Sequence, residues 1–222
     1  MLHLCLILFI GCLIIINTVV ADINPLCSLV AATNIEYLFS EWSCNINGQT
    51  VTNPCDPDWY GINCTTTNDT DINAISIESI GLSGTIPSGL FELAPLQYLI
   101  MNNNSLINGI PTNIGSLTNL LVLNLDRNKL DGIIPDNIGS LSSLSVLSLH
   151  RCALLGPLPS SFSQLTHLVN LNLNVNEIHG SIGTILWTLD QLTTLSFEDN
   201  GLTGSISTAI SQLTSLQALS LG

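Results

Sequence analysis

Apolar residues recur along most of this chain with a fixed period. The clearest column of the pattern consists of leucines spaced 24 residues apart without any insertion: Leu93, Leu117, Leu141, Leu165, Leu189 and Leu213. A constant period of this length is typical of architectures in which one short structural unit is stacked many times. The pattern therefore predicts a solenoid.

Within each unit, a short stretch alternates between apolar and polar positions. The apolar pairs are Ile75/Ile77, Leu99/Met101, Leu123/Leu125, Leu147/Leu149, Leu171/Leu173, Leu195/Phe197 and Leu219/Leu221. Because the side chains of a β-strand point alternately to its two faces, each pair predicts a strand with one buried face. We expect the seven strands to stack as a parallel sheet. A further column in the same register is expected to pack on the opposite side and comprises Leu90, Ile114, Ile138, Phe162, Leu186 and Ile210.

The fullest copy of the unit begins at Leu117 and ends at Pro135, and it reads Leu-x-x-Leu-x-x-Leu-x-Leu-x-x-Asn-x-Leu-x-Gly-x-Ile-Pro. This pattern resembles the leucine-rich repeat, specifically its plant-type form of 24 residues. The resemblance covers residues 72–222 as six full repeats and a truncated seventh. It implies an α/β solenoid, a leucine-rich repeat horseshoe with a parallel β-sheet on its concave side and a disulfide-bonded helical cap at its N-terminal end.

Three further columns have structural roles. The position three residues after each strand is expected to hold backbone groups of adjacent repeats through a buried amide. It is occupied by Asn104, Asn128, Asn176 and Asn200. Cys152 takes this position in one repeat, where we expect a buried, unpaired thiol. A further column is expected at positive φ, which glycine adopts readily, and it comprises Gly84, Gly132, Gly156, Gly180 and Gly204. Asn108 takes this position in one repeat, and asparagine also tolerates a positive φ. Prolines constrain the next turn in four repeats, but Gly183 and Ser207 replace them, so we expect a softer C-terminal end.

Residues 22–71 are expected to cap the repeats. Residues 29–42 have helical apolar spacing, and the later stretch from Trp59 to Cys64 resembles the Trp-x-Gly-x-x-Cys closure of plant-type extracellular repeat proteins. A solenoid end exposes an apolar edge that such a cap shields. The segment contains four cysteines, which allow three pairings: Cys27, Cys44, Cys55 and Cys64. Cys55–Cys64 with Cys27–Cys44 is the simplest pairing, because the loop between Cys55 and Cys64 is short.

The N-terminus has the pattern of a targeting segment. An unbroken apolar run of 13 residues occupies positions 4–16. After it, Val19 and Ala21 lie at the −3 and −1 positions of a small-residue cleavage site that follows Ala21. Residues 1–21 are therefore predicted to be a secretory signal peptide. The segment before the run has no Lys or Arg, so a retained membrane anchor is the alternative. Clustered cysteines agree with export, as do three Asn-x-Ser/Thr acceptor patterns for glycan, at Asn63, Asn68 and Asn103. We expect a secreted or cell-surface protein on the extracellular side.

Charge limits the class of partner. The chain has 16 acidic and 3 basic residues, a net charge of −13. Nucleic-acid binding needs clustered basic side chains, so it is excluded, and a basic or neutral partner is expected. Catalytic, cofactor and metal motifs are absent from the sequence. The stretch that begins at Asp56 starts like a calcium loop but lacks the later oxygen ligands, and His150, His167 and His179 occupy non-equivalent repeat positions. We expect no enzymatic activity, cofactor or metal.

The outward strand positions form the candidate binding surface, because Tyr and Arg are favoured in binding sites and both occur there. The candidate ligand-binding residues are Tyr98, Val122, Asn124, Asp126, Arg127, Val146, His150 and Arg151. The resemblance implies an extracellular recognition module that binds a protein, peptide or glycan ligand through its concave face, with a co-receptor as a further partner. Alternatives are a secreted inhibitor of a wall-degrading enzyme and a structural surface-coat protein. Since the sequence ends at Gly222 inside a strand pattern, we expect a fragment of a receptor-like protein or receptor-like kinase, whose membrane span would lie in a missing C-terminal segment.

Overall fold

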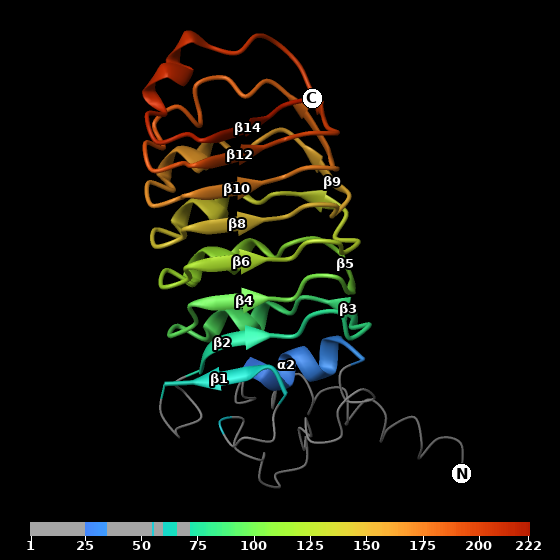
Figure 1. The fold of residues 1–222 in the computed structure, drawn as a ribbon. Helices are drawn as coiled ribbons and strands as arrows, with labels where there is room; N and C mark the ends of the chain where they lie inside the picture. The colour runs from blue at the N-terminus through green and yellow to red at the C-terminus, as the bar shows by residue number, and fades with distance from the viewer. Residues whose placement is uncertain (1–24, 35–54, 56–59, 66–71) are drawn as a thin grey trace, which may run out of the picture.

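The computed structural model describes residues 25–34, 55, 60–65 and 72–222. Its main feature is a sheet of eight strands in the order β1-β2-β4-β6-β8-β10-β12-β14 (Figure 1). Seven of these strands are parallel, each one repeat further along the chain: β2 (Ile72–Ser76), β4 (Tyr98–Ile100), β6 (Val122–Asn124), β8 (Val146–Ser148), β10 (Asn170–Asn172), β12 (Thr194–Ser196) and β14 (Ala218–Ser220). The register confirms the predicted period, since Leu99 pairs with Leu123 and Leu123 with Leu147. The solenoid and its parallel sheet are as predicted.

A second set of short strands runs along the side of the solenoid where the main strands end, at the right-hand edge of Figure 1. It comprises β3 (Ser83–Thr85), β5 (Ser105–Ile107), β7 (Gly132–Ile133), β9 (Leu154–Gly156), β11 (Glu177–Gly180) and β13 (Gly201–Leu202). β3 pairs with β5, and the other four form a sheet in the order β13-β11-β9-β7. The apolar pattern did not predict these strands, because they lie around the glycine column, which indicates turns. They give the solenoid a second hydrogen-bonded face.

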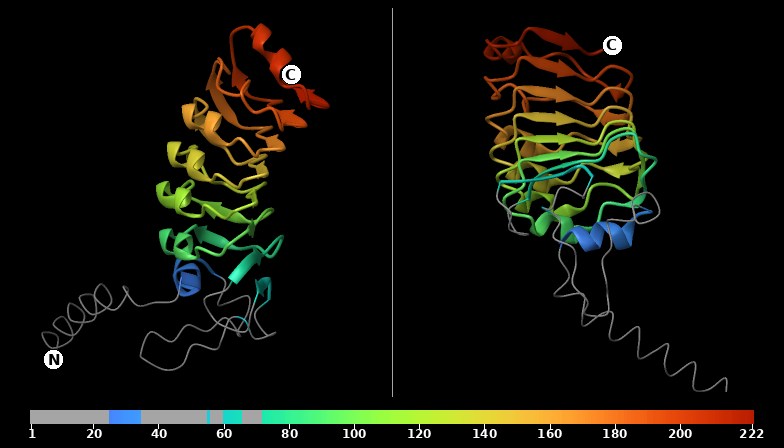
Figure 2. Two further views of the ribbon diagram at one scale, coloured as in Figure 1. Left: turned by 90° about the vertical axis from the view of Figure 1, so that its left-hand side faces the viewer. Right: turned by 60° about the horizontal axis from the view of Figure 1, so that its bottom comes forward.

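Short 3-10 helices lie on the side opposite the main sheet (Figure 2). They are η2 (Ser88–Glu92), η3 (Thr112–Ser116), η4 (Asp136–Ser140), η5 (Ser160–Gln164) and η6 (Thr208–Gln212). Each of the first four begins directly after a proline, whose restricted φ suits this entry: Pro87, Pro111, Pro135 and Pro159. The predicted packing column of this side is buried from Leu90 to Leu186, and its last member, Ile210, is half-buried.

The two repeats without proline behave differently from each other. Ser207 keeps the extended conformation of the prolines, with φ −65° and ψ 145°, and its hydroxyl accepts a hydrogen bond from the backbone N–H of Ala209. Gly183 instead has a positive φ of 58°, and residues 183–188 form a turn where the other repeats have a 3-10 helix. The Trp187 indole N–H donates to the Gly183 carbonyl and holds this turn. The sequence variation thus changes local structure only at Gly183.

Buried asparagines join neighbouring repeats as predicted. The amide nitrogen of Asn128 donates to the carbonyl of Met101 in the preceding repeat at 3.0 Å and to Leu125 at 2.8 Å. Its amide oxygen accepts the backbone N–H of Leu106 at 3.0 Å. Asn104 and Asn176 make the equivalent bonds. Each amide satisfies backbone groups that no strand reaches.

Cys152 is a free, fully buried thiol, as expected. Its sulfur donates to the carbonyl of Leu125 at 3.1 Å, the same place in the repeat that each asparagine amide reaches. Burial raises the pKa of the thiol to about 12, so the group is protonated at neutral pH. It therefore replaces the donor half of an asparagine.

The glycine column also has the expected conformation. Gly84, Gly132, Gly156, Gly180 and Gly204 all have positive φ, and so does Asn108 at 68°. At Gly84 the requirement is also steric, because an added Cβ would collide with the carbonyl oxygen of Ala32 in the cap.

The N-terminal cap docks on the first repeat through helix α2 (Pro25–Ala32), which buries Leu26 and Leu29. The predicted helix over 29–42 is wrong in its boundaries, since α2 begins at Pro25 and ends at Ala32. After this point the chain leaves the helix to bond the repeats. Thr33 bridges to Gly84, and the side-chain oxygen of Asn34 accepts the backbone N–H of Ser83 at 2.6 Å. Residues 35–42 lie outside the described residues, as does the predicted signal peptide at 1–21.

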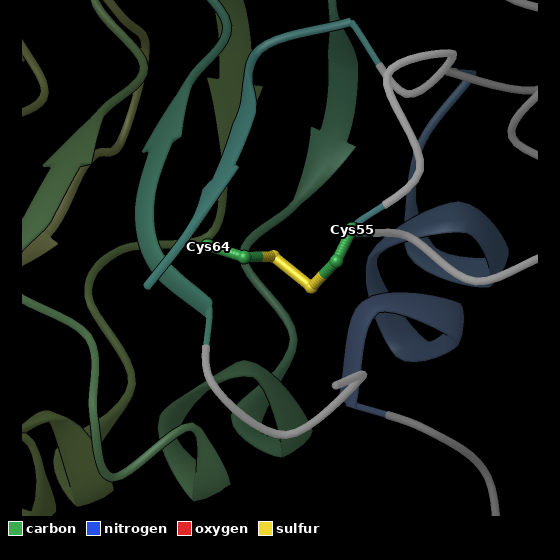
Figure 3. The surroundings of a disulfide bond; sticks show 2 residues. All are labelled: Cys55 and Cys64. Atoms are coloured by element: carbon green, nitrogen blue, oxygen red, sulfur yellow. A yellow bond between two sulfur atoms is a disulfide. The ribbon is translucent and has the colours of Figure 1, made fainter. Parts of the chain in front are cut away.

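A disulfide joins Cys55 to Cys64, the pairing that the short loop favoured (Figure 3). It anchors β1 (Ile62–Cys64), which pairs with β2 in the antiparallel direction and covers the first edge of the main sheet. Cys27 is also disulfide-bonded, while its expected partner Cys44 lies outside the described residues.

Candidate binding face

The outward side chains of the main sheet form the face that the sequence analysis singled out, which we call the concave face. They lie in three rows across the repeats. The entry row is Ala74, Tyr98, Val122, Val146, Asn170, Thr194 and Ala218. The middle row is Ser76, Ile100, Asn124, Ser148, Asn172, Ser196 and Ser220. The exit row directly follows the strands and is Glu78, Asn102, Asp126, His150, Asn174 and Glu198.

The central polar group of this face is the carboxylate of Asp126. Its Oδ1 accepts the hydroxyl of Ser148 at 2.7 Å and the backbone N–H of His150 at 2.7 Å. The backbone N–H of Asp126 in turn donates to Oδ1 of Asn124 at 3.1 Å. These bonds fix the orientation of a negative charge in the middle of the face, where it attracts a cationic or hydrogen-donating group.

The same pairing of a middle-row serine with an exit-row acid occurs near both ends of the sheet. The hydroxyl of Ser76 donates to Glu78 and that of Ser220 donates to Glu198, each at 3.2 Å. The three rows contain these carboxylates and no Lys or Arg. The electrostatic field of the concave face therefore favours a basic or neutral ligand.

An apolar patch adjoins the acids at the other end of the strands. Tyr98, Val122 and Val146 are neighbours in the entry row and are half-buried. Their exposed parts offer contact area for apolar side chains of a ligand, and the tyrosine adds a hydroxyl at its rim. The face thus presents apolar groups at strand entry and polar groups at strand exit.

Two atoms of the exit row have spare hydrogen-bonding capacity. Oδ1 of Asn102 and Nδ1 of His150 are both buried and make no hydrogen bond to any described residue. They flank Asp126, one repeat on either side. Both atoms lack accessible surface, so a ligand along the exit row reaches them only if the side chain of Asn102 or His150 rotates.

Two of the candidate residues directly follow the exit row, at the opposite end of the strands from the apolar patch. Arg127 and Arg151 are exposed and have φ of 54° and 59°, at the corner where the chain leaves the main sheet. Arg127 is five residues beyond Val122, about 16 Å for an extended chain. The arginines therefore do not adjoin the apolar patch. Asn124, Asp126 and His150, by contrast, are brought together as expected.

Ser148 is a polar residue of this face that the sequence-derived set lacks. It is buried and directs its hydroxyl at both oxygens of Asp126. The sequence shows its place in the middle row, but not that it bonds an acid of the preceding repeat.

No group of three His, Cys, Asp or Glu suited to a metal ion occurs within the described residues. No helix in that part of the chain is long and apolar enough to cross a bilayer.

Two of the three predicted glycan acceptors can be located. Asn63 is exposed on β1, and Asn103 is exposed beside the exit row, where its amide nitrogen donates to Ser79 at 2.8 Å. Asn68 lies outside the described residues.

The model of the family described as Leucine Rich Repeat matches residues 95–117, 119–141, 143–165 and 191–213. No similar sequence was found among the curated proteins.

Several solved structures are similar to the chain. The plant peptide hormone receptor RGFR1 in complex with RGF2 is 35% identical, over 69% of this chain and 24% of that one, with a TM-score of 0.66. The Arabidopsis receptor kinase HAESA, in complex with the peptide hormone IDA and the co-receptor SERK1, is 29% identical over 89% of this chain and 32% of that one, with a TM-score of 0.77. The BIR2 ectodomain from Arabidopsis thaliana is 28% identical over 82% of this chain and 94% of that one, with a TM-score of 0.69. The chain thus spans about a quarter of the RGFR1 chain and nearly all of the BIR2 ectodomain.

Proposed function

Because the chain belongs to the plant-type extracellular leucine-rich repeat proteins, we propose that it is a receptor-like recognition module whose concave face binds an extended peptide outside the cell. The observation that carries the proposal is the exit row. There the carboxylate of Asp126, held by the hydroxyl of Ser148 and the backbone N–H of His150, lies between the polar side chains of Asn102 and His150 in the neighbouring repeats. The backbone of an extended peptide has alternating donors and acceptors that match such a row.

The ligand class follows from charge and shape. Carboxylates in the exit row favour a peptide that is neutral or basic, and the half-buried entry row favours apolar side chains at one of its edges. The complexes of RGFR1 with RGF2 and of HAESA with IDA, both peptide hormone receptors, support a peptide in preference to the glycan that the sequence also allowed. Catalysis has no place in this function.

The test is binding of a panel of synthetic extended peptides, basic, neutral and acidic, to the full chain and two matched variants. Val122→Lys with Val146→Lys places charged side chains on the entry row, whereas Ser163→Lys places one on η5 at the opposite side. Basic and neutral peptides are expected to lose at least about tenfold in affinity with the double variant and nothing with Ser163→Lys. Binding that is equal in both variants, or confined to acidic peptides, would contradict the proposal.

A second candidate function is association with another receptor ectodomain. It is favoured by two solved structures, the BIR2 ectodomain and a BIR3–SERK2 complex. In each of them the match to this chain covers 94% of the other chain. In this case the partner is a folded protein, and peptide binding is unnecessary. Sedimentation of the chain mixed with a co-receptor ectodomain such as SERK2 distinguishes the two functions, since only the second predicts a complex without peptide.

A further inference from the structure

The three basic residues of the whole sequence lie together on one side of the solenoid, outside the rows of the concave face. They are Arg127, Lys129 and Arg151. Arg127 and Lys129 lie between β6 and β7, and Arg151 has the position of Arg127 in the next repeat, ahead of β9. All three are exposed. In a chain of net charge −13, this is the one region of the sequence with an excess of positive charge.

Exposed apolar side chains adjoin these cations on the second set of strands. Ile107, Ile133 and Leu155 are 40%, 61% and 41% exposed and belong to β5, β7 and β9. They are three of the six large hydrophobic residues that are exposed in the described part of the chain. This side, at the right-hand edge of Figure 1, therefore combines two kinds of exposed group that are rare elsewhere in the molecule.

Strand pairing makes the cations and the apolar groups one continuous surface. Ile133 pairs directly with Leu155, and Ile107 forms a bridge with Lys129. Directly paired residues project to the same side of a sheet with their Cβ atoms about 5 Å apart. We define the lateral face as the six residues Ile107, Arg127, Lys129, Ile133, Arg151 and Leu155.

The alternation of buried and exposed residues confirms that these side chains point outward. Arg151, Ala153 and Leu155 are exposed, whereas the intervening Cys152 and Leu154 are fully buried. The acids of this side are few. Asp131 is exposed between Lys129 and Ile133, and Glu177 pairs with Leu155 at the border on β11. With both of these acids counted, this side retains a net charge of +1 from three basic and two acidic groups, and Asp126 directly precedes Arg127 at its border.

We propose that the lateral face docks a partner protein through a segment that combines acidic and apolar side chains. Carboxylates complement the three cations, and apolar side chains cover Ile133, whose exposure is otherwise unfavourable. A second copy of this chain is a poor occupant, because two molecules of net charge −13 repel each other. This surface adjoins the exit row of the concave face, because Arg127 and Arg151 directly follow Asp126 and His150, but its cations favour ligands of the opposite charge.

The experiment uses the full chain and three matched sets of synthetic peptides. The first set combines acidic and apolar side chains. The second set has amides in place of the acidic side chains, and the third has serines in place of the apolar residues. Binding is measured at about 50 and 300 mM NaCl, because screening weakens contacts between exposed charges. The first set is expected to bind, more tightly at low salt, and at least about tenfold more tightly than the other two.

Two variants locate the contact. R127N/K129Q/R151N removes the cations without creating an Asn-x-Ser/Thr pattern, with asparagine chosen because Asn103 already occupies the same column at a φ of 55°. I133S/L155S removes the apolar groups. Each variant is expected to weaken the binding of the acidic-apolar peptides at least about tenfold. The control V175N/H179S changes the positions of Arg151 and Leu155 in the next repeat and is expected to leave binding within about twofold. An unchanged far-ultraviolet circular dichroism spectrum and melting temperature show that a variant is folded. If one of the two variants is not folded, the single substitution R151E gives a further test.

Several results would overturn the proposal. The first is that the acidic-apolar peptides do not bind, or bind no more tightly than the amide or serine sets. The second is that the variants do not weaken their binding. The third is that the chain binds polygalacturonate, in a salt-sensitive way, in preference to the peptides. Concentration-dependent self-association that I133S/L155S abolishes would assign the face to a second copy instead. The concave variants Val122→Lys and Val146→Lys are expected to leave lateral binding unchanged, so the two proposals fail independently.

Discussion

At the scale of single residues, position in the repeat decides the role of each side chain more than its type does. Asn124 and Asn128 are four residues apart in the same repeat. The first is half-exposed on the concave face and accepts a neighbouring backbone N–H, while the second is buried and joins two adjacent repeats through its amide. Cys152 shows the same rule, since a thiol placed in the asparagine column reaches the carbonyl that the amides reach.

Cys152 is expected to be unreactive in the folded chain. Burial raises the pKa of its thiol to about 12, and the thiolate is the species that alkylating reagents attack. Iodoacetamide at about pH 8 should modify Cys152 only after denaturation, as measured by mass spectrometry. Because the folded state holds this proton more tightly than the unfolded chain, whose thiol has a pKa near 9.0, the free energy of unfolding should fall as pH rises from about 9 toward 12. Rapid labelling of the native chain would show that the thiol is accessible, and C152S, which does not titrate in this range, is the control.

At the scale of elements, most repeats consist of a main strand, a short lateral strand and a 3-10 helix, and the repeats differ at the turn that precedes the helix position. Four repeats enter the helix from proline with φ between −59° and −76°. Ser207 keeps that conformation by accepting a hydrogen bond from Ala209, whereas Gly183 abandons it for a positive φ. The two replacements are equivalent in the sequence but not in structure.

Proline substitution separates these two positions. G183P is expected to destabilise the chain by at least about 2 kcal/mol, because proline is incompatible with a positive φ. S207P suits the observed φ, and the entropy it removes from the unfolded chain roughly offsets the lost cap, so its effect should stay within about 1 kcal/mol. Urea unfolding measures both. Equal destabilisation by the two variants would mean that the turn at Gly183 does not have the left-handed conformation.

At the scale of the whole molecule, charge is distributed by face. The concave rows contain carboxylates without Lys or Arg, while the three cations lie on the lateral face. The two surfaces therefore favour ligands of opposite charge, although they meet where Arg127 follows Asp126 and Arg151 follows His150. Because 16 acidic residues face only three basic ones, most carboxylates have no cation to neutralise them.

This excess of negative charge should make stability depend on salt. Raising NaCl from about 20 to 200 mM is expected to raise the melting temperature, because screening reduces repulsion among the carboxylates. Scanning calorimetry checks the shift, and an equal osmolality of a neutral solute is the control. A melting temperature that is constant or falls with NaCl would show that repulsion between carboxylates does not limit stability.

The sequence by itself determined the solenoid, the register of the seven parallel strands, the asparagine and glycine columns and the buried state of Cys152. These features follow from residue type and a strict period, since the same local conformation recurs wherever the pattern does. The concave rows could be derived in the same way, because side chains alternate along a strand. The pairing of Cys55 with Cys64 was the simplest of three that the sequence allowed.

Only the tertiary structure decided the features that depend on contacts between repeats. The lateral strands lie around the glycine column, which indicates turns, and they exist because neighbouring repeats supply their hydrogen bonds. Helix α2 ends at Ala32, earlier than its apolar spacing predicts, because Thr33 and Asn34 bond the first repeat. Ser148 meets Asp126 across 22 residues of chain, and Arg127 departs from the apolar patch because its backbone turns at the corner. Such contacts are set by how adjacent repeats stack, which no single repeat encodes.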